Sequence, residues 1–122
     1  MKKVLLVDDV NFLLEFETAV IKQLSKETGT TINVEEASSI QKALQKISEN
    51  DYDSMVLDIN LPDGLGIDIA KAARKKNADT RIAMLTISPE NYDEYREYFD
   101  VFMKKPVIPD TYKEVMRKLL NL

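Results

Sequence analysis

Short apolar runs alternate with segments of helical periodicity along the chain. Five runs are bounded by polar or turn residues, as is typical of short buried strands: residues 4–7, 32–34, 55–57, 82–85 and 101–103. Residues 31–35 alternate between apolar and polar, which predicts an edge strand. Residues 4–7 and 55–57 are continuously apolar, which predicts central strands.

Apolar residues recur at helical spacing between these runs. Four stripes predict helices with one buried face: Leu13, Leu14, Val20, Ile21 and Leu24; Ile40, Ala43, Leu44 and Ile47; Ile69, Ala70 and Ala73; Tyr112, Val115, Met116 and Leu119. A further helix is expected at residues 91–99, where tyrosines recur every three residues. Their spacing predicts partial packing on the sheet and leaves some of these rings free for partner contacts.

Cap and turn residues agree with these boundaries. Residues 38–39 are both serine and precede the second helix. Residues 88–90 offer a serine N-cap, a proline at the first helical position and an acid in the first turn. The sequence Pro-Asp-Gly at residues 62–64 predicts a turn before the third helix.

The tally is five strands that alternate strictly with five helices. This alternation predicts a parallel sheet covered on both faces and joined by right-handed crossovers. We therefore expect one open, doubly wound α/β domain, of the (βα)5 type, over residues 1–122.

Composition excludes several kinds of chemistry. The 122 residues include neither His nor Cys. A Ser-His-Asp triad, a cysteine nucleophile, a disulfide and the usual zinc ligands are therefore all excluded. Any bound metal is expected to be a hard cation on oxygen ligands.

Charge and hydropathy indicate the setting. The 17 basic and 21 acidic side chains give a net charge of −4, which argues against direct nucleic-acid binding. No apolar stretch approaches the ~18–20 residues of a membrane span, and the first residues do not form a signal peptide. We therefore expect a cytoplasmic domain that does not contact the membrane.

Chemistry-bearing residues follow the predicted strands. Asp8 and Asp9 come after the first strand, Asp58 after the third, Thr86 after the fourth and Lys105 after the fifth. In a doubly wound sheet, ligands bind beyond the carboxyl ends of the strands. Three neighbouring carboxylates repel one another unless a cation is present, and Mg²⁺ is the hard cation that suits them. With a lysine and a hydroxyl, the set predicts a phosphorylatable aspartate, since a carboxylate is a nucleophile toward phosphorus.

These residues resemble the receiver domain of bacterial two-component response regulators over essentially the whole chain. The similarity rests on the acidic pair Asp8-Asp9, the string Asp-Ile-Asn-Leu-Pro at residues 58–62 followed by two glycines, Leu-Thr at residues 85–86, and Lys-Pro at residues 105–106. Each motif is weak alone, and the four in order are specific. The resemblance implies a flavodoxin-like sheet of order 2-1-3-4-5.

The resemblance also implies roles at the acidic end. Asp58 would accept a phosphoryl group from the phosphohistidine of a sensor histidine kinase or a histidine phosphotransfer protein. Asp9 would bind Mg²⁺ directly, Asp8 through water, and the backbone carbonyl of Asn60 would add a ligand, with Mn²⁺ as the alternative ion. In this family Asp58 is itself part of the metal site.

Three residues would contact or report the phosphoryl group. Thr86 and Lys105 would contact its oxygens, and the peptide bond after Lys105 is cis in this family. Phe102 stands where the family carries an aromatic that changes rotamer with Thr86. Strand alternation sends Lys104 and Lys105 to opposite sides, and the family pattern selects the residue next to the proline.

Each of these residues also has a purely structural interpretation. Asp8-Asp9 could cap the first helix, and Asp58 could form the turn that follows it. A threonine in a strand is usually structural, and Phe102 could be a core aromatic. The constellation as a whole favours the site.

Ile87 departs from the family pattern, in which the residue after the threonine is small. A bulky side chain there would hinder the incoming phosphohistidine or the hydrolytic water. The sequence thus predicts slower phosphotransfer, slower self-dephosphorylation, or both.

The function expected from the sequence is a phosphorylation switch, not an enzyme, although it would catalyse its own phosphotransfer and autodephosphorylation. Its output surface would comprise the fourth helix, the fifth strand and the fifth helix, and it would serve an unidentified output protein or domain, or a homodimer formed on phosphorylation. Two alternatives remain. One is a receiver-like scaffold that acts without phosphorylation. The other is an aspartate phosphatase of the haloacid dehalogenase type, whose nucleophile belongs on the first strand with an acid two residues later.

Overall fold

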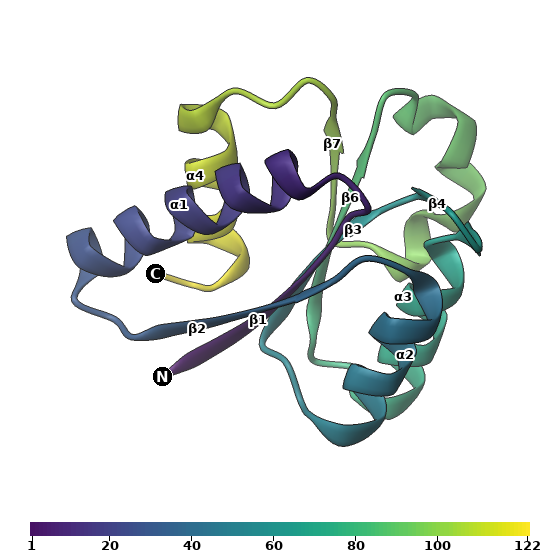
Figure 1. Cartoon of the computed structure of the whole chain (residues 1–122), viewed down its shortest axis with the longest axis horizontal. Helices are drawn as coiled ribbons and strands as arrows, with labels where there is room; N and C mark the ends of the chain where they lie inside the picture. The colour runs from purple at the N-terminus through teal and green to yellow at the C-terminus, as the bar shows by residue number, and fades with distance from the viewer.

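A five-stranded parallel sheet lies at the centre of the computed structural model, which describes residues 1–122 (Figure 1). Its strands are β1 (Lys2–Val7), β2 (Ile32–Ala37), β3 (Ser54–Asp58), β6 (Arg81–Thr86) and β7 (Val101–Lys104). They lie in the order β2-β1-β3-β6-β7, and every neighbouring pair is parallel. This is the expected 2-1-3-4-5 order, with β2 at an edge, so the predicted fold is confirmed.

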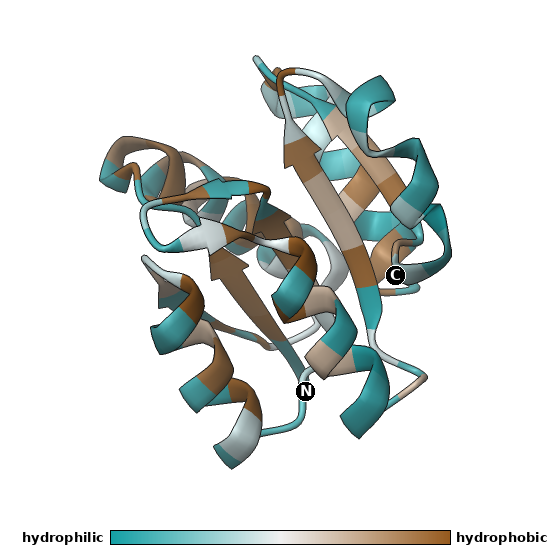
Figure 2. Ribbon diagram, turned by 90° about the vertical axis from the view of Figure 1, so that its right-hand side faces the viewer, coloured by the Kyte–Doolittle hydropathy of each residue, from teal (hydrophilic) through white to brown (hydrophobic).

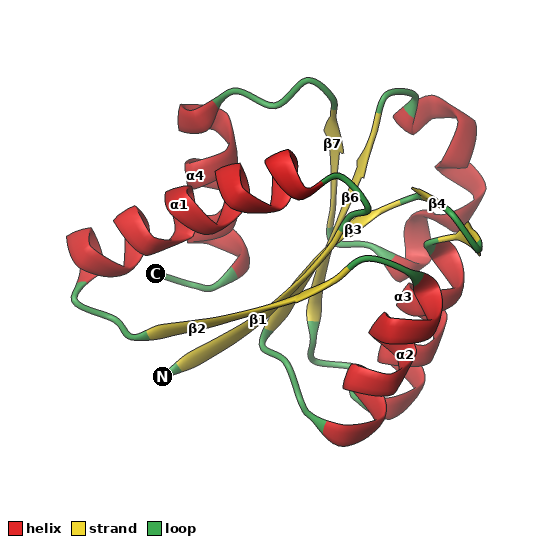
Figure 3. Ribbon diagram, in the orientation of Figure 1, coloured by secondary structure: helices red, strands yellow, loops and turns green.

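Helices cover both faces of the sheet (Figure 3). Helices α1 (Asn11–Thr28) and α4 (Pro109–Leu119) lie side by side on one face, and α2 (Ile40–Glu49) and α3 (Ile67–Lys76) lie on the other. Each face carries its own cluster of buried apolar side chains. Figure 2 shows hydrophobic strands between helices whose outer surfaces are largely hydrophilic. No helix has both the length and the apolar character needed to cross a membrane.

A small hairpin that the sequence pattern does not reveal follows β3. Its strands, β4 (Asn60–Leu61) and β5 (Gly64–Leu65), pair antiparallel around the predicted Pro-Asp-Gly turn. Gly64 has a φ of 144°, a conformation that side-chain-bearing residues rarely adopt. The hairpin is too short to carry a periodic signal, so only its turn was predictable.

The fourth helical segment differs from the α-helix expected at residues 91–99. It is a 3-10 helix, η1 (Pro89–Tyr98), broken at Tyr92, whose φ of −120° is not helical. Side chains three residues apart eclipse in a 3-10 helix, which accounts for the tyrosine repeat better than an α-helix does. Tyr95 and Tyr98 both lie near the ammonium of Lys71 on α3, at 5.6 and 5.7 Å.

The predicted caps are only partly correct. Ser39 precedes α2, and its hydroxyl accepts a hydrogen bond from the Lys42 amide, as expected. Ser88 precedes η1, with a proline at the start of that helix, but its side chain forms no capping bond. Leu44 was expected to be buried in the stripe of α2, yet it is 36% exposed because it lies at the border of that stripe.

Candidate functional site

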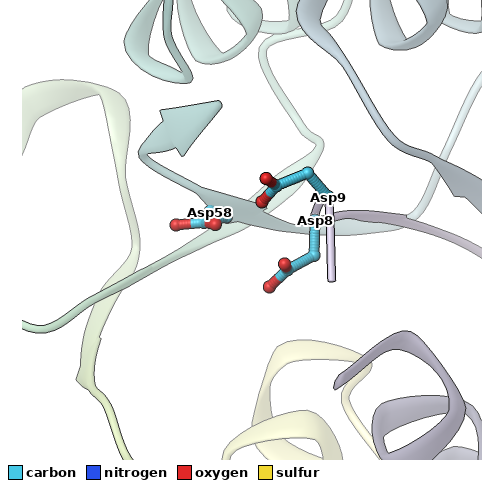
Figure 4. A group of neighbouring side chains, drawn as sticks. All are labelled: Asp8, Asp9 and Asp58. Atoms are coloured by element: carbon cyan, nitrogen blue, oxygen red, sulfur yellow. The ribbon is translucent and has the colours of Figure 1, made fainter. Parts of the chain in front are cut away.

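The carboxyl ends of β1 and β3 bring the three predicted aspartates together. Asp8 and Asp9 follow β1 directly, and Asp58 is the last residue of β3. Because Val7 is in register with Leu57, the residues that follow them emerge at the same edge of the sheet. One carboxylate oxygen from each aspartate lies within 4.8 Å of the others (Figure 4).

Local backbone bonds fix two of these acids. Asp8 is fully buried, and its Oδ1 accepts a hydrogen bond from the Val10 amide at 2.9 Å, at the start of α1. Asp58 is 5% exposed, and its Oδ1 accepts from the Asn60 amide at 3.3 Å. Asp9 is exposed. The site is therefore a pair of held carboxylates with a third acid facing solvent.

Lys105 provides the cation of the cluster. Its Nζ lies 3.4 Å from Asp8 Oδ2 and 3.4 Å from Asp58 Oδ2. Its backbone amide donates to the Thr86 carbonyl at 2.8 Å, and the bond to Pro106 is cis, as the family resemblance implies. Lys104 is exposed and has no ion-pair partner. Of the two adjacent lysines, Lys105 is thus the one that reaches the acids.

Burial raises the pKa of the Asp58 carboxyl, and the nearby Asp8 carboxylate raises it further. The Lys105 ammonium and the Asn60 amide oppose this shift. Loss of solvation outweighs these favourable contacts. A cation bound among the acids would favour the ionised, nucleophilic form of Asp58.

Thr86 ends β6 at the same edge of the sheet. It is 1% exposed, and its Oγ1 accepts a hydrogen bond from the Ser88 amide at 3.3 Å. Its hydroxyl proton can therefore be donated to another oxygen. The next residue, Ile87, is 64% exposed, so a large apolar side chain stands in solvent beside the site.

Phe102 lies on β7, opposite Met84 of β6. Strand alternation places Met84 and Thr86 on the same face of the sheet, so Phe102 shares that face. Its half-buried ring packs edge-to-face on Phe99, with centroids 5.7 Å apart, and the Arg96 guanidinium lies 4.6 Å from its centroid. Phe102 therefore connects β7 to η1.

Gly66 supports the segment behind Asp58. A Cβ at this position would lie 2.3 Å from the Asp58 carbonyl oxygen, which is a clash with backbone. The Gly66 amide also donates to the Ile59 carbonyl at 2.8 Å. Only glycine lets the start of α3 approach the end of β3 so closely.

The sequence did not reveal the roles of two carboxylates, Glu17 and Asp63. Glu17 of α1 is 2% exposed, and its Oε1 accepts a hydrogen bond from the Tyr112 hydroxyl of α4 at 2.8 Å. Burial raises the pKa of Glu17 to about 8. The signal was present, because Glu17 stands three residues after Leu14 and four before Ile21, within the apolar stripe.

Asp63, in the turn of the hairpin, was predicted only as a turn residue. Its two carboxylate oxygens accept hydrogen bonds from the Ile40 and Gln41 amides at the start of α2, at 2.9 and 3.1 Å. These bonds lower the pKa of Asp63. The loop after Asp58 is thus bonded to the first turn of α2.

Comparison with known proteins identifies the family. The model of the response regulator receiver domain matches residues 4–117. The chain belongs to this family. It is a receiver domain in which the acids, Thr86 and Lys105 occupy the ends of the expected strands.

Solved structures and characterised relatives agree with this assignment. The receiver domain superposes on chemotaxis response regulator CheY4 of Vibrio cholerae with a TM-score of 0.83 and 29% identity, over 98% of this chain and 99% of that one. TrrA of Thermotoga maritima, in complex with Mg(2+)-BeF, gives a TM-score of 0.78 and 30% identity, over 98% of this chain and 100% of TrrA.

The response regulator SaeR of Staphylococcus aureus is 28% identical over 125 residues, which is 100% of this chain and 50% of SaeR. A putative transcriptional regulator of Haloferax volcanii is 30% identical over 92 residues, which is 75% of this chain and 16% of that protein. The receiver domain therefore spans half or less of the length of these relatives.

Proposed function

We propose that this receiver domain is a phosphorylation switch that accepts a phosphoryl group on Asp58 from the phosphohistidine of a sensor histidine kinase or a histidine phosphotransfer protein. The observation that carries the proposal is the position of Lys105 Nζ, 3.4 Å from both Asp8 Oδ2 and Asp58 Oδ2. The ammonium lies within reach of the acid that would carry the phosphoryl group.

The phosphoryl transfer takes place between two reactants, Asp58 and the donor phosphohistidine. An Asp58 carboxylate oxygen attacks phosphorus, the phosphorus–nitrogen bond of the donor histidine breaks, and that nitrogen keeps the electron pair. The product is an acyl phosphate on Asp58 and a free imidazole on the donor. Lys105 and the Thr86 hydroxyl stabilise the charge on the phosphoryl oxygens. The domain catalyses this transfer and its own later hydrolysis.

Mg²⁺ fits the donor set, because the clustered ligands are all carboxylate oxygens and the chain has neither His nor Cys. Asp8, Asp9, Asp58 and the backbone carbonyl of Asn60 would hold it, and Mn²⁺ is the alternative ion. When bound, it supplies positive charge to the phosphoryl oxygens.

The donor histidine would lie outside these 122 residues, which include none. The partner would dock on exposed apolar side chains around the site, namely Val10, Phe12, Ile87 and Ile108. Phosphorylation would act on the surface formed by η1, β7 and α4 through Thr86 and Phe102. An output protein or domain, or a second copy of this chain, would recognise that surface. A cytoplasmic location remains an expectation from the sequence.

Incubation with acetyl phosphate and Mg²⁺, followed by intact-protein mass spectrometry, tests the proposal. We expect a gain of one phosphoryl group that is lost in Asp58→Asn and kept in Asp68→Asn, a matched change at an exposed acid on α3. Omission of Mg²⁺ should also prevent the gain.

One other function has an observation in its favour. The exposed Ile87 beside Thr86 would suit a receiver-like scaffold that binds partners without phosphorylation. Absence of any mass gain with acetyl phosphate would favour that scaffold. Catalytic release of phosphate from many substrates would instead favour a phosphatase of the haloacid dehalogenase type. Two features oppose it: Asp58 ends the third sheet strand along the chain, not the first, and the residue two positions later is Asn60, not an acid.

A further inference from the structure

A mostly apolar cavity of about 550 Å³ lies beside the acidic cluster, between α1, the end of β6 and the segment that joins β7 to α4. This volume is within the range of pockets that hold small organic molecules, roughly 300–1,000 Å³. Its walls are mainly aromatic and aliphatic and include Phe12, Phe16, Leu85, Ile87, Val107 and Tyr112.

A buried carboxyl group lines this cavity. Glu17 is 2% exposed, and only its Oε1 has a hydrogen-bond partner in the protein, the Tyr112 hydroxyl. Its Oε2 has no partner in the protein. Among the side-chain polar atoms that are completely buried, only Ser54 Oγ lacks a hydrogen-bond partner, so Oε2 is not completely buried. Since Glu17 lines the cavity, the cavity is the space that Oε2 faces.

The charges around the cavity select against an ionic ligand. The groups whose charge acts on Glu17 are Asp8 and Asp58 from the strand ends and Lys105 from the segment after β7, and Tyr112 of α4 bonds to it directly. The acids repel an anion. Asp8 and Asp58 do not line the cavity, and both are paired with Lys105, so a cation inside it finds no free carboxylate partner.

Glu17 itself supplies a hydrogen-bond donor at neutral pH. Burial raises its pKa to about 8, so the carboxyl group is mainly protonated. Oε1 accepts from Tyr112, which leaves the hydroxyl of the acid to donate from Oε2. A ligand that complements it presents an acceptor at one end and an apolar body toward the aromatic walls.

We propose that this cavity binds an uncharged, apolar small molecule with one hydrogen-bond acceptor, of the arylalkyl ketone class, and that Glu17 donates to that acceptor. This function goes beyond phosphotransfer and does not depend on it. A ligand there would contact Ile87 and Lys105, so its binding would be coupled to the phosphoacceptor site.

Titration of the unphosphorylated protein with 4-phenyl-2-butanone, followed by amide NMR spectra, tests the proposal. We expect saturable shifts confined to residues around the cavity, with a Kd below about 5 mM. Two analogues of similar size, 3-phenylpropionate and 3-phenylpropylamine, should bind about tenfold or more weakly, since each would bury a charge among apolar walls without a free partner of opposite sign.

Paired variants locate the site. Val107→Phe fills the cavity and should abolish the shifts, whereas Ile108→Phe, at the neighbouring exposed residue that does not line it, should preserve them. Glu17→Met removes the donor and should weaken binding about tenfold, the value of one hydrogen bond. The amide spectra of each variant report whether it is folded.

Three results would overturn the proposal: no saturable shift of the wild-type protein, equal affinity for the charged analogues, or unchanged binding by a folded Val107→Phe variant. None of these bears on the acetyl phosphate experiment, which tests Asp58 alone.

Discussion

At the scale of single residues, we propose that Ile87 limits access to Asp58. It follows Thr86, is 64% exposed, and lines the apolar cavity together with Lys105. We expect Ile87→Ala to increase the rate of phosphotransfer, of self-dephosphorylation, or both, by up to about tenfold. Such an increase corresponds to an activation free energy that is lower by ~1.4 kcal/mol.

The measurement is the time course of phosphorylation and of phosphate loss, with acetyl phosphate as the donor. Ile108→Ala is a matched control, because Ile108 is 62% exposed and lies three residues after Lys105. Unchanged rates in both directions for Ile87→Ala would exclude a gating role for this side chain.

Glu17 makes stability depend on pH in an unusual direction. Its pKa is raised from 4.5 to about 8 by burial, so between these values the folded protein keeps a proton that the unfolded chain has lost. Stability from this group is complete below about pH 4.5 and is lost as pH rises through 8. The expected slope is about 1.4 kcal/mol per pH unit.

Urea unfolding at several pH values measures this effect as the difference between the wild-type protein and Glu17→Gln, which cannot titrate. The wild-type protein should lose free energy of unfolding relative to Glu17→Gln as pH rises from 4.5 to 8. Glu15→Gln, at an exposed position on the same helix, should show no such change. A constant difference for Glu17→Gln would contradict the assigned burial.

Site residues at the ends of strands could be predicted from the sequence more readily than the one on a helix. The positions of Asp8, Asp58, Thr86 and Lys105 followed from one rule, that the carboxyl ends of parallel strands meet at one edge. The spacing of Glu17 to Leu14 and Ile21 places it on the buried face of α1, but the sequence pattern does not reveal the partner, Tyr112, that accompanies its burial. That contact joins residues 95 positions apart.

At the scale of elements, the hairpin turn and α2 are linked through Asp63. Its carboxylate accepts from two amides in the first turn of α2, beyond the bond that Ser39 already provides. We expect Asp63→Ala to lower the melting temperature by a few degrees, because it leaves helix N-terminal amides without these acceptors.

Thermal unfolding followed by circular dichroism measures the change. Asp68→Ala removes an exposed acid from the first turn of α3 and serves as the control, with a smaller expected effect. The Asp63 effect should diminish at low pH, because its pKa is lowered in the folded state and protonation removes the acceptor charge. An equal decrease in melting temperature for both variants would argue against a role of Asp63 as a cap of α2.

The element predicted least well is η1. The three-residue repeat of tyrosines matches the period of a 3-10 helix, but such helices seldom run beyond about three or four residues, so an α-helix was the expectation for residues 91–99. Tertiary contacts decide: Arg74 of α3 donates to the Tyr98 carbonyl at 3.2 Å and pairs with Asp100 at 2.7 Å. These bonds hold the end of η1 against α3, and they involve residues on three different segments.

At the scale of the whole molecule, the acidic cluster opposes folding unless its charges are compensated. Asp8 and Asp58 are both buried, with Lys105 between them and Asp9 nearby. We expect Mg²⁺ to raise the melting temperature by a few degrees at about ten times its Kd, since a ligand of the native state alone stabilises by ~1.4 kcal/mol there.

Differential scanning calorimetry with and without MgCl₂ measures the shift, and NaCl at equal ionic strength controls for screening. Asp9→Asn should reduce the shift without changing the fold, because Asp9 is exposed. An identical shift with NaCl would exclude a specific metal site.

The overall topology was predictable because strict alternation of strand and helix leaves few arrangements of a parallel sheet. The edge position of β2 followed from its polar alternation, and the central positions of β1 and β3 from their continuous apolar runs. The hairpin β4–β5 was not predictable, since two-residue strands carry no period. Its turn is held by the α2 amides that donate to Asp63, and Gly66 after it passes close to the Asp58 carbonyl, where a side chain would not fit.

The contact between Lys105 and Asp8 spans 97 positions of the chain, and it has a consequence for synthesis. A ribosome delivers all three acids long before it delivers β7 and the lysine that follows it. A nascent chain therefore carries Asp58 without the Lys105 ammonium and without the fifth strand of the sheet. The proposed switch could therefore assemble only after nearly the whole domain has emerged.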